Sequence, residues 1–60
     1  METDLAYYRR RACEENAAAE AALHPKVRSI HLDLKRCYEE RAIAIESRYE
    51  GSALHLVSAA

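Results

Sequence analysis

The chain contains one proline, Pro25, and one glycine, Gly51, and these two residues punctuate an otherwise uniform sequence. The segments around them are rich in Ala, Glu, Arg and Leu, which lose little free energy on entering a helix. β-branched residues are few, and no stretch alternates apolar and polar residues for long enough to indicate a strand. The sequence therefore predicts an all-α chain whose helix boundaries lie near Pro25 and Gly51.

The helix ends follow from capping rules. Thr3 or Asp4 is expected to act as the first N-cap, because its side-chain oxygen can accept a hydrogen bond from a free backbone N–H. Proline fits the first turn of a helix and disfavours helical geometry in the preceding residue. Gly51 is expected to form a left-handed C-terminal cap, and the tail beyond it either continues as helical turns or lies extended. The predicted organisation is a single domain, residues 1–60, with helix 4–23, turn 24–25, helix 26–50 and tail 51–60.

A turn this short makes the two helices antiparallel neighbours in a helical hairpin. Projection at 100° per residue gives each helix one apolar face, small on the first helix and bulkier on the second. The first face contains Leu5, Tyr8, Ala12, Ala19 and Leu23, with Glu15 and Asn16 at its edges; the second contains Val27, Ile30, Leu34, Tyr38, Ala42, Ile45 and Tyr49, with His31 inside its edge. Folding the hairpin pairs small residues with large ones, as interdigitated packing requires.

One helix pair of this size buries little apolar surface against the conformational entropy lost on folding. Half of the residues are hydrophobic, but alanine is the commonest of them, so few side chains can fill an interior. We therefore expect a homodimer in which two hairpins complete a four-helix bundle. A protein partner is expected to meet apolar residues outside the main face. These predicted partner contacts are Leu32, Ile43, Leu54, Leu56 and Val57.

The charge balance argues against a nucleic-acid or membrane partner. Nine basic and ten acidic residues give a net charge of −1, and Arg9, Arg10 and Arg11 fan around a helix instead of forming a patch. Glu14 and Glu15 stand four residues after Arg10 and Arg11, where they can pair with them. There is no apolar run of about 18 residues and no basic N-terminal signal, so a cytoplasmic protein is expected.

The cysteines and histidines are not spaced as in disulfide, metal or catalytic sites. Cys13 and Cys37 lie at similar heights on opposite flanks of the predicted hairpin, which favours free thiols. The histidines do not match zinc-site spacing, so no metal or cofactor is expected. His31 and Tyr38 lie two helical turns apart, and His31 is expected to bond a tyrosine, a carboxylate or a backbone group instead of serving in catalysis.

The stretch Leu5–Ala12 and the pattern His31-x-x-Leu34-x-x-x-Tyr38-x-x-Arg41 resemble short helical-hairpin proteins of unknown function from α-proteobacteria, especially sphingomonads. The resemblance implies a bacterial cytosolic protein, brings no activity with it, and draws attention to four residues. These candidate polar-site residues are Tyr8, His31, Tyr38 and Arg41. The resulting prediction is a non-enzymatic, self-associating interaction or regulatory module. The alternative is a bundle that binds a small ligand or a metal in a dimer cavity, using His31, Tyr38 and the cysteines.

Overall fold

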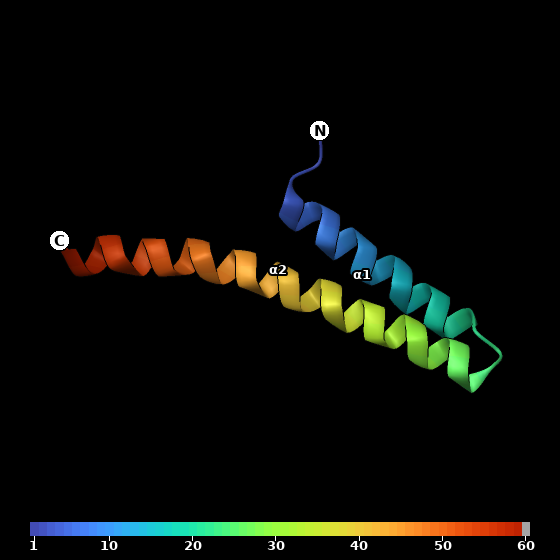
Figure 1. Ribbon diagram of the computed structural model, residues 1–60. Helices are drawn as coiled ribbons and strands as arrows, with labels where there is room; N and C mark the ends of the chain where they lie inside the picture. The colour runs from blue at the N-terminus through green and yellow to red at the C-terminus, as the bar shows by residue number, and fades with distance from the viewer. Residues whose placement is uncertain (60) are drawn as a thin grey trace.

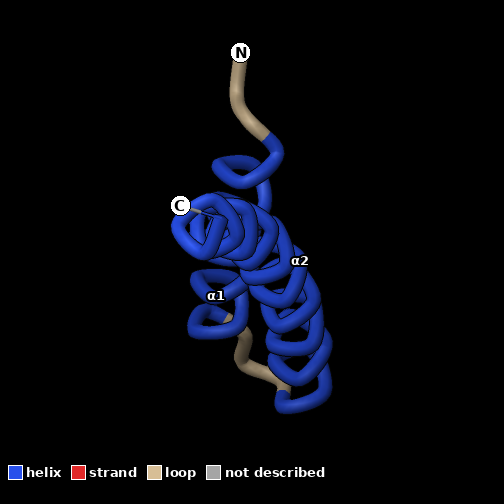
Figure 2. The backbone as a smooth tube through the Cα atoms, turned by 90° about the vertical axis from the view of Figure 1, so that its left-hand side faces the viewer, coloured by secondary structure: helices blue, strands red, loops and turns tan. Residues whose placement is uncertain are grey.

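The chain forms two helices joined by a short link in the computed structural model, which describes the backbone of residues 1–59 and the side chains of residues 1–49 (Figure 1). Helix α1 spans Asp4–Ala21 and helix α2 spans Pro25–Ala59. The helices run antiparallel, side by side near the link and further apart toward the N-terminus (Figures 1 and 2). The predicted all-α hairpin is confirmed for these residues, which contain no strand.

Helix α1 begins at a side-chain cap and ends earlier than predicted. Thr3 is the N-cap, and its hydroxyl oxygen accepts from the backbone N–H of Ala6 at 3.1 Å. The predicted end at residue 23 is wrong, because Ala22 already has extended geometry (φ −70°, ψ 127°). The N–H of Ala22 donates to the carbonyl of Ala19 at 3.2 Å and closes the helix. Leu23 consequently lies in the link and is fully exposed, not on the contact face.

The link between the helices is held by two side chains. Pro25 is the first residue of α2, and the Nδ1 atom of His24 accepts from the backbone N–H of Lys26 at 3.1 Å. This ring nitrogen therefore caps α2 as a serine or aspartate oxygen commonly does. Arg28 reaches back from the first turn of α2 and donates to the carbonyl of Ala22 at 3.1 Å. The reversal is thus fixed by contacts on both of its sides.

Helix α2 continues well past the predicted boundary at residue 50. Gly51 lies within the helix, so its assignment as a left-handed cap is wrong. A glycine inside a helix costs about 1 kcal/mol relative to alanine, which is too little to end a helix flanked by good helix formers. The last part of α2, residues 50–59, extends beyond the end of α1 (Figure 1) and is called the overhang below. The predicted contacts Leu54, Leu56 and Val57 fall here, outside the described side chains.

The helices contact each other along a narrow line of small residues, called the seam below. Among the described residues, the buried apolar side chains are Ala12 and Ala19 of α1 and Ala42 of α2, with Ala19 only 2% exposed. Half-buried side chains such as Tyr38 and Ile45 lie along the same line of α2. Alanine lets helix backbones approach closely but removes little apolar area from water.

The bulky residues predicted to fill this seam lie largely outside it. Val27, Ile30, Leu34 and Tyr49 are all exposed, with Ile30 at 56% and Leu34 at 40%. The buried or half-buried α2 positions near the link are instead His31 and Lys35, one residue further on in each case. One residue turns a helix by 100°, so this shift moves the aliphatic stripe from the seam to its flank.

The molecule is elongated, and this shape follows from the seam. Its radius of gyration is 15.5 Å and its extents are 54 × 24 × 11 Å. A compact chain of this length would have a radius of gyration of about 10 Å. Neither described helix combines the length and apolar character that a bilayer crossing requires.

Enlarging an alanine in the seam should separate the helices. We expect Ala19→Leu to lower the free energy of unfolding by about 1–3 kcal/mol, because the added carbons have no space at a buried position. Ala17→Leu is the matched control, since Ala17 is exposed on the same helix. Urea unfolding followed by circular dichroism measures the stability of both variants. Equal midpoints would contradict the close packing of Ala19 between the helices.

Candidate functional site

The most buried polar side chain in the described part of the chain is Glu15, which is 7% exposed in the seam between Ala12 and Ala19. Its Oε1 atom accepts from Nη2 of Arg11 at 3.1 Å, and its Oε2 atom lies 2.7 Å from Nδ1 of His31. A buried carboxylate is strongly destabilising unless both oxygens are bonded, and here both are. The three side chains therefore form a polar crosslink from α1 to α2.

The crosslink explains the position of His31. The sequence left open a tyrosine, a carboxylate or a backbone group as its partner, and the partner is the carboxylate of Glu15. Glu15 itself was predicted only at an edge of the contact face, although its spacing from Ala12 and Ala19 places it on the same side of α1. That i, i+3, i+7 spacing is the sequence signal for its burial.

A cluster of three tyrosines lies next to this crosslink. The ring centroids of Tyr7 and Tyr8 are 5.4 Å apart, and those of Tyr8 and Tyr38 are 6.2 Å apart. Tyr7 meets Tyr38 edge to face at 6.4 Å. Aromatic pairs at these separations add attraction beyond the area that they bury. The cluster thus joins α1 to α2 where the seam offers no large aliphatic side chain.

Each tyrosine of the cluster carries an arginine over its ring. Arg10 lies 5.3 Å from the centroid of Tyr7, Arg11 lies 5.2 Å from that of Tyr38, and Arg41 lies 5.6 Å from that of Tyr8. Arg41 also donates to the hydroxyl of Tyr8 at 3.5 Å, and this bond raises the pKa of Arg41. Of the predicted polar-site residues, the structure brings together Tyr8, Tyr38 and Arg41, while His31 bonds Glu15 instead.

The three consecutive arginines, Arg9 to Arg11, form ion pairs with glutamates. Arg9 pairs with Glu46 across the helices, and Arg10 forms a two-pronged bond to Glu2 at 2.9 and 3.0 Å. The predicted pairs Arg10–Glu14 and Arg11–Glu15 are both present, at 2.5 and 3.1 Å. Arg10 and, to a smaller extent, Arg11 hold the pKa of Glu14 below its usual range through their hydrogen bonds. The run is therefore a charge-balanced surface.

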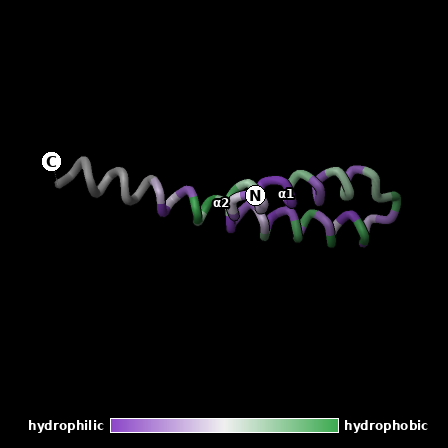
Figure 3. The backbone as a smooth tube through the Cα atoms, turned by 90° about the horizontal axis from the view of Figure 1, so that it is seen from above, coloured by the Kyte–Doolittle hydropathy of each residue, from purple (hydrophilic) through white to green (hydrophobic). Residues whose placement is uncertain are grey.

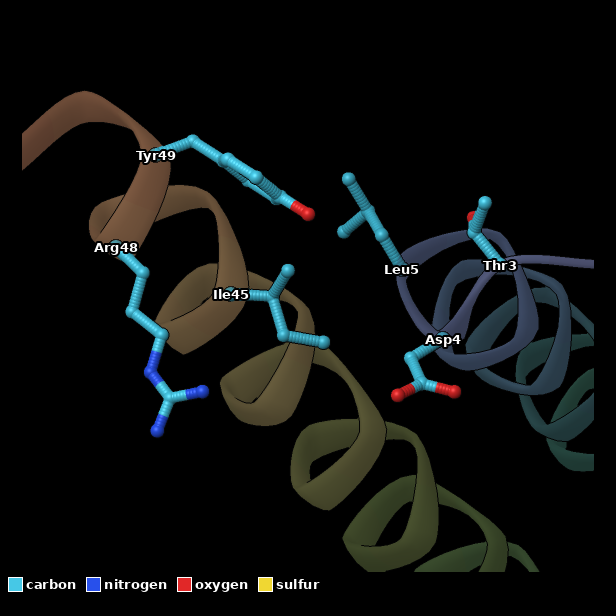
Figure 4. A pocket seen from close by; sticks show the side chains of 6 residues that line it. All are labelled: Thr3, Asp4, Leu5, Ile45, Arg48 and Tyr49. Carbon is cyan, nitrogen blue, oxygen red and sulfur yellow. The ribbon is translucent and has the colours of Figure 1, made fainter. Parts of the chain in front are cut away.

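The helices diverge at the open end of the hairpin and leave a pocket of about 490 Å³ between them (Figure 4). Leu5 of α1 and Ile45 and Tyr49 of α2 point toward this space in the view of Figure 4. Thr3, Asp4 and Arg48 complete the lining. Leu5 and Ile45, each on the predicted contact face of its helix, thus form two walls of an open wedge.

An exposed apolar surface extends from the link along the first turns of α2. It is called the loop-end stripe below and consists of Leu23, Val27, Ile30 and Leu34, which recur at spacings of four, three and four residues. All four are exposed, and Figure 3 shows hydrophobic positions recurring along α2 near the link. Leu23 lies in the link, and the spacing of Val27, Ile30 and Leu34 on α2 is typical of a helix face that packs against another helix. Within the described hairpin, α1 does not cover it.

Leu32 and Ile43, two predicted partner contacts, are both exposed, at 40% and 61%. They stand eleven residues apart and so share one side of α2. Ile43 borders a shallow groove of about 550 Å³ whose lining includes Ala12 and Ala42 of the seam. The groove residues are Arg9, Ala12, Cys13, Glu39, Ala42 and Ile43.

The cysteines and histidines do not gather into a metal centre in the described part of the chain. Cys13 and Cys37 are free and exposed. No group of three or more His, Cys, Asp or Glu side chains among the described residues is arranged to hold a metal ion. One ring nitrogen of His31, Nδ1, lies against the carboxylate of Glu15.

Comparison with protein-family models, curated proteins and solved structures finds no match to this chain. The resemblance to α-proteobacterial hairpin proteins therefore stays a prediction.

Removing one side of the polar crosslink should destabilise the hairpin more than removing both. We expect His31→Leu to lower the free energy of unfolding by about 1–3 kcal/mol, because the buried carboxylate of Glu15 loses a partner. The double variant Glu15→Met with His31→Leu should recover most of that loss, since no unpartnered carboxylate remains buried. Chemical unfolding of the four proteins in the cycle measures the coupling, and additive losses would argue against the crosslink.

The ion pairs of Glu14 predict a loss of stability in acid. Because its pKa is lowered in the folded hairpin, Glu14 contributes stability above about pH 4.5 that is lost as the pH falls through the lowered pKa. We expect Glu14→Gln to melt below the wild type at pH 7 and to approach it at pH 3. Thermal unfolding across this range tests the sign, and a constant difference between the proteins would contradict it.

Proposed function

We propose that this chain is a non-enzymatic, self-associating protein-interaction module. The observation that carries the proposal is that small apolar side chains are buried while larger ones are exposed. The buried apolar residues of the described hairpin are alanines, while the aliphatic residues of the loop-end stripe, including Ile30 and Leu34, are exposed. A contiguous exposed apolar surface on a small protein commonly marks a contact with another protein.

The surface around the stripe has the composition of a protein interface. Leu34 precedes Tyr38 by one helical turn, and Tyr7 reaches the ring of Tyr38 from α1. The apolar surface therefore continues from α2 to α1 through a cluster in which arginines stack on tyrosines. Tyrosine and arginine are enriched in interface centres because they combine large contact area with polar ends.

A second copy of the chain is the partner that best fits this surface. Chains of about 60 residues bury a smaller fraction of their surface on folding than larger domains do, and oligomerisation is one of the ways in which such chains gain stability. Two hairpins that bury their loop-end stripes in a shared contact would make a four-helix bundle with two-fold symmetry. The side bearing Leu32 and Ile43 would then remain on the outside of the dimer, where we propose that it meets a different protein.

A charge placed in the stripe should dissociate the dimer. We expect the wild type to sediment as a dimer at micromolar concentration and Ile30→Lys to raise the dissociation constant at least tenfold, because each interface would bury an unpaired ammonium group. Ser29→Lys is the matched control, since it adds the same charge at an exposed neighbouring position that points to another side of α2.

Analytical ultracentrifugation measures the three proteins, with circular dichroism as the test of folding. A wild type that stays a folded monomer at about 100 µM would refute self-association. Equal dissociation constants for Ile30→Lys and Ser29→Lys would instead place the interface elsewhere on the hairpin.

A further inference from the structure

Helix α2 carries two unpartnered features at opposite ends. The loop-end stripe lies beside the link, where Val27, Ile30 and Leu34 are exposed. The overhang, residues 50–59, lies at the far end and runs beyond α1 (Figure 1). One feature is an apolar surface without a helix against it, and the other is a helical segment without a neighbour in the hairpin.

The mismatch in helix length means that α1 cannot partner both features within one chain. Helix α1 has 18 residues and α2 has 35, which correspond to about 27 Å and 52 Å at 1.5 Å per residue. Helix α1 also packs on the line of Ala42 and Tyr38, at one flank of the stripe. No rearrangement of the short link lets 18 residues cover the stripe and accompany the overhang at the same time.

We propose that the hairpins pair with their links at opposite ends, so that α2 of one copy runs antiparallel to α2 of the other. The overhang of each copy then lies beside the loop-end stripe of its partner. This arrangement rests on the proposed self-association and specifies its geometry. It gives every unpartnered segment a neighbour, and two-fold symmetry forms the same contact twice.

The lengths and charges of α2 favour this orientation over a parallel one. The overhang is about 15 Å long, and the stripe from Val27 to Leu34 extends about 10 Å, so one can span the other. The first turns of α2 carry Lys26 and Arg28 and have no acidic residue, while its last turn has no basic residue. Antiparallel pairing brings these cations to the partner's helix C-terminus, where the helix dipole favours positive charge.

A parallel arrangement would lose both advantages. The two stripes would pack on each other, and the two overhangs would stand side by side beyond the hairpins. Lys26 and Arg28 of both copies would also meet at the same end, where like charges repel. The two orientations therefore predict different distances between equivalent points on α2.

Spin labels attached to cysteines that replace two serines of α2 distinguish the antiparallel from the parallel orientation. Ser29 and Ser47 are both exposed and stand 18 residues apart, which is five full helical turns, so labels on them point to the same side of α2. The background carries Cys13→Ser and Cys37→Ser, since both cysteines are free and exposed. Each label is introduced singly, as Ser29→Cys or Ser47→Cys, and the distance between the two subunits is measured by pulsed electron resonance.

If the overhang covers residues 25–34 of the partner, the two-fold axis passes near residue 42. The distance between equivalent labels then grows by about 3 Å for each residue away from that axis, because both helices recede from it at 1.5 Å per residue. We expect the distance at position 29 to exceed that at position 47 by roughly 25 Å. Equal distances at the two positions would overturn the antiparallel arrangement. Absence of any inter-subunit distance would instead mean that self-association itself fails.

A variant pair at Gly51 tests the contribution of the overhang. Gly51→Pro removes a helical hydrogen bond and kinks α2 where the overhang begins, outside the contact with α1. We expect it to raise the dimer dissociation constant at least tenfold relative to Gly51→Ala, which keeps the helix intact. The hairpin should remain folded in both variants by circular dichroism. Equal dissociation constants for the two would overturn the role of the overhang.

Discussion

Close contact between two helices through alanine is the constraint on which the rest of this structure depends. Ala12, Ala19 and Ala42 leave space for the backbones to approach but contribute little apolar burial. The polar crosslink of Glu15 is therefore important in the seam, because it joins one turn of α1 to one turn of α2 at a buried position. Polar groups at helix contacts commonly specify register in this way.

The crosslink also determines where the large side chains go. His31 must face α1 to reach Glu15, so Ile30 and Leu34 turn toward the flank of the hairpin. The tyrosine cluster compensates in part, since its rings join the helices beyond the crosslink. The hairpin is thus held by polar and aromatic contacts beside its alanines, while Val27, Ile30 and Leu34 stay exposed.

The sequence was sufficient to predict features that depend on local chemistry. The helical class, the break at Pro25, an N-cap at Thr3 or Asp4 and the pairing of Arg10 with Glu14 each follow from residues close together in the chain. Gly51 shows the limit of this approach, because its preference for a cap is worth only about 1 kcal/mol and the helical context outweighs it.

The rotation of α2 could not be predicted from its hydrophobic pattern. Val27, Ile30, Leu34 and Tyr38 form a continuous apolar stripe, and projection alone assigns the centre of such a stripe to the nearest helix. The structure instead divides the stripe, with Tyr38 in the seam and the aliphatic residues outside it. The buried carboxylate of Glu15 binds His31 and so turns α2 away from the orientation that its apolar stripe predicts. Such a polar pair between helices cannot be recognised from the spacing of hydrophobic residues.

The division of the stripe bears on function through symmetry. In the proposed dimer the loop-end stripes are consumed by self-association, so the side with Leu32 and Ile43 becomes the exposed apolar surface of the assembly. Two-fold symmetry would present that surface twice in such a dimer. A partner with two matching sites would gain affinity from simultaneous binding without any new contact, provided that its spacing matches. In the proposed dimer a chain this short would act as a bivalent connector, because its size limits the core but not the number of surfaces that such an assembly displays.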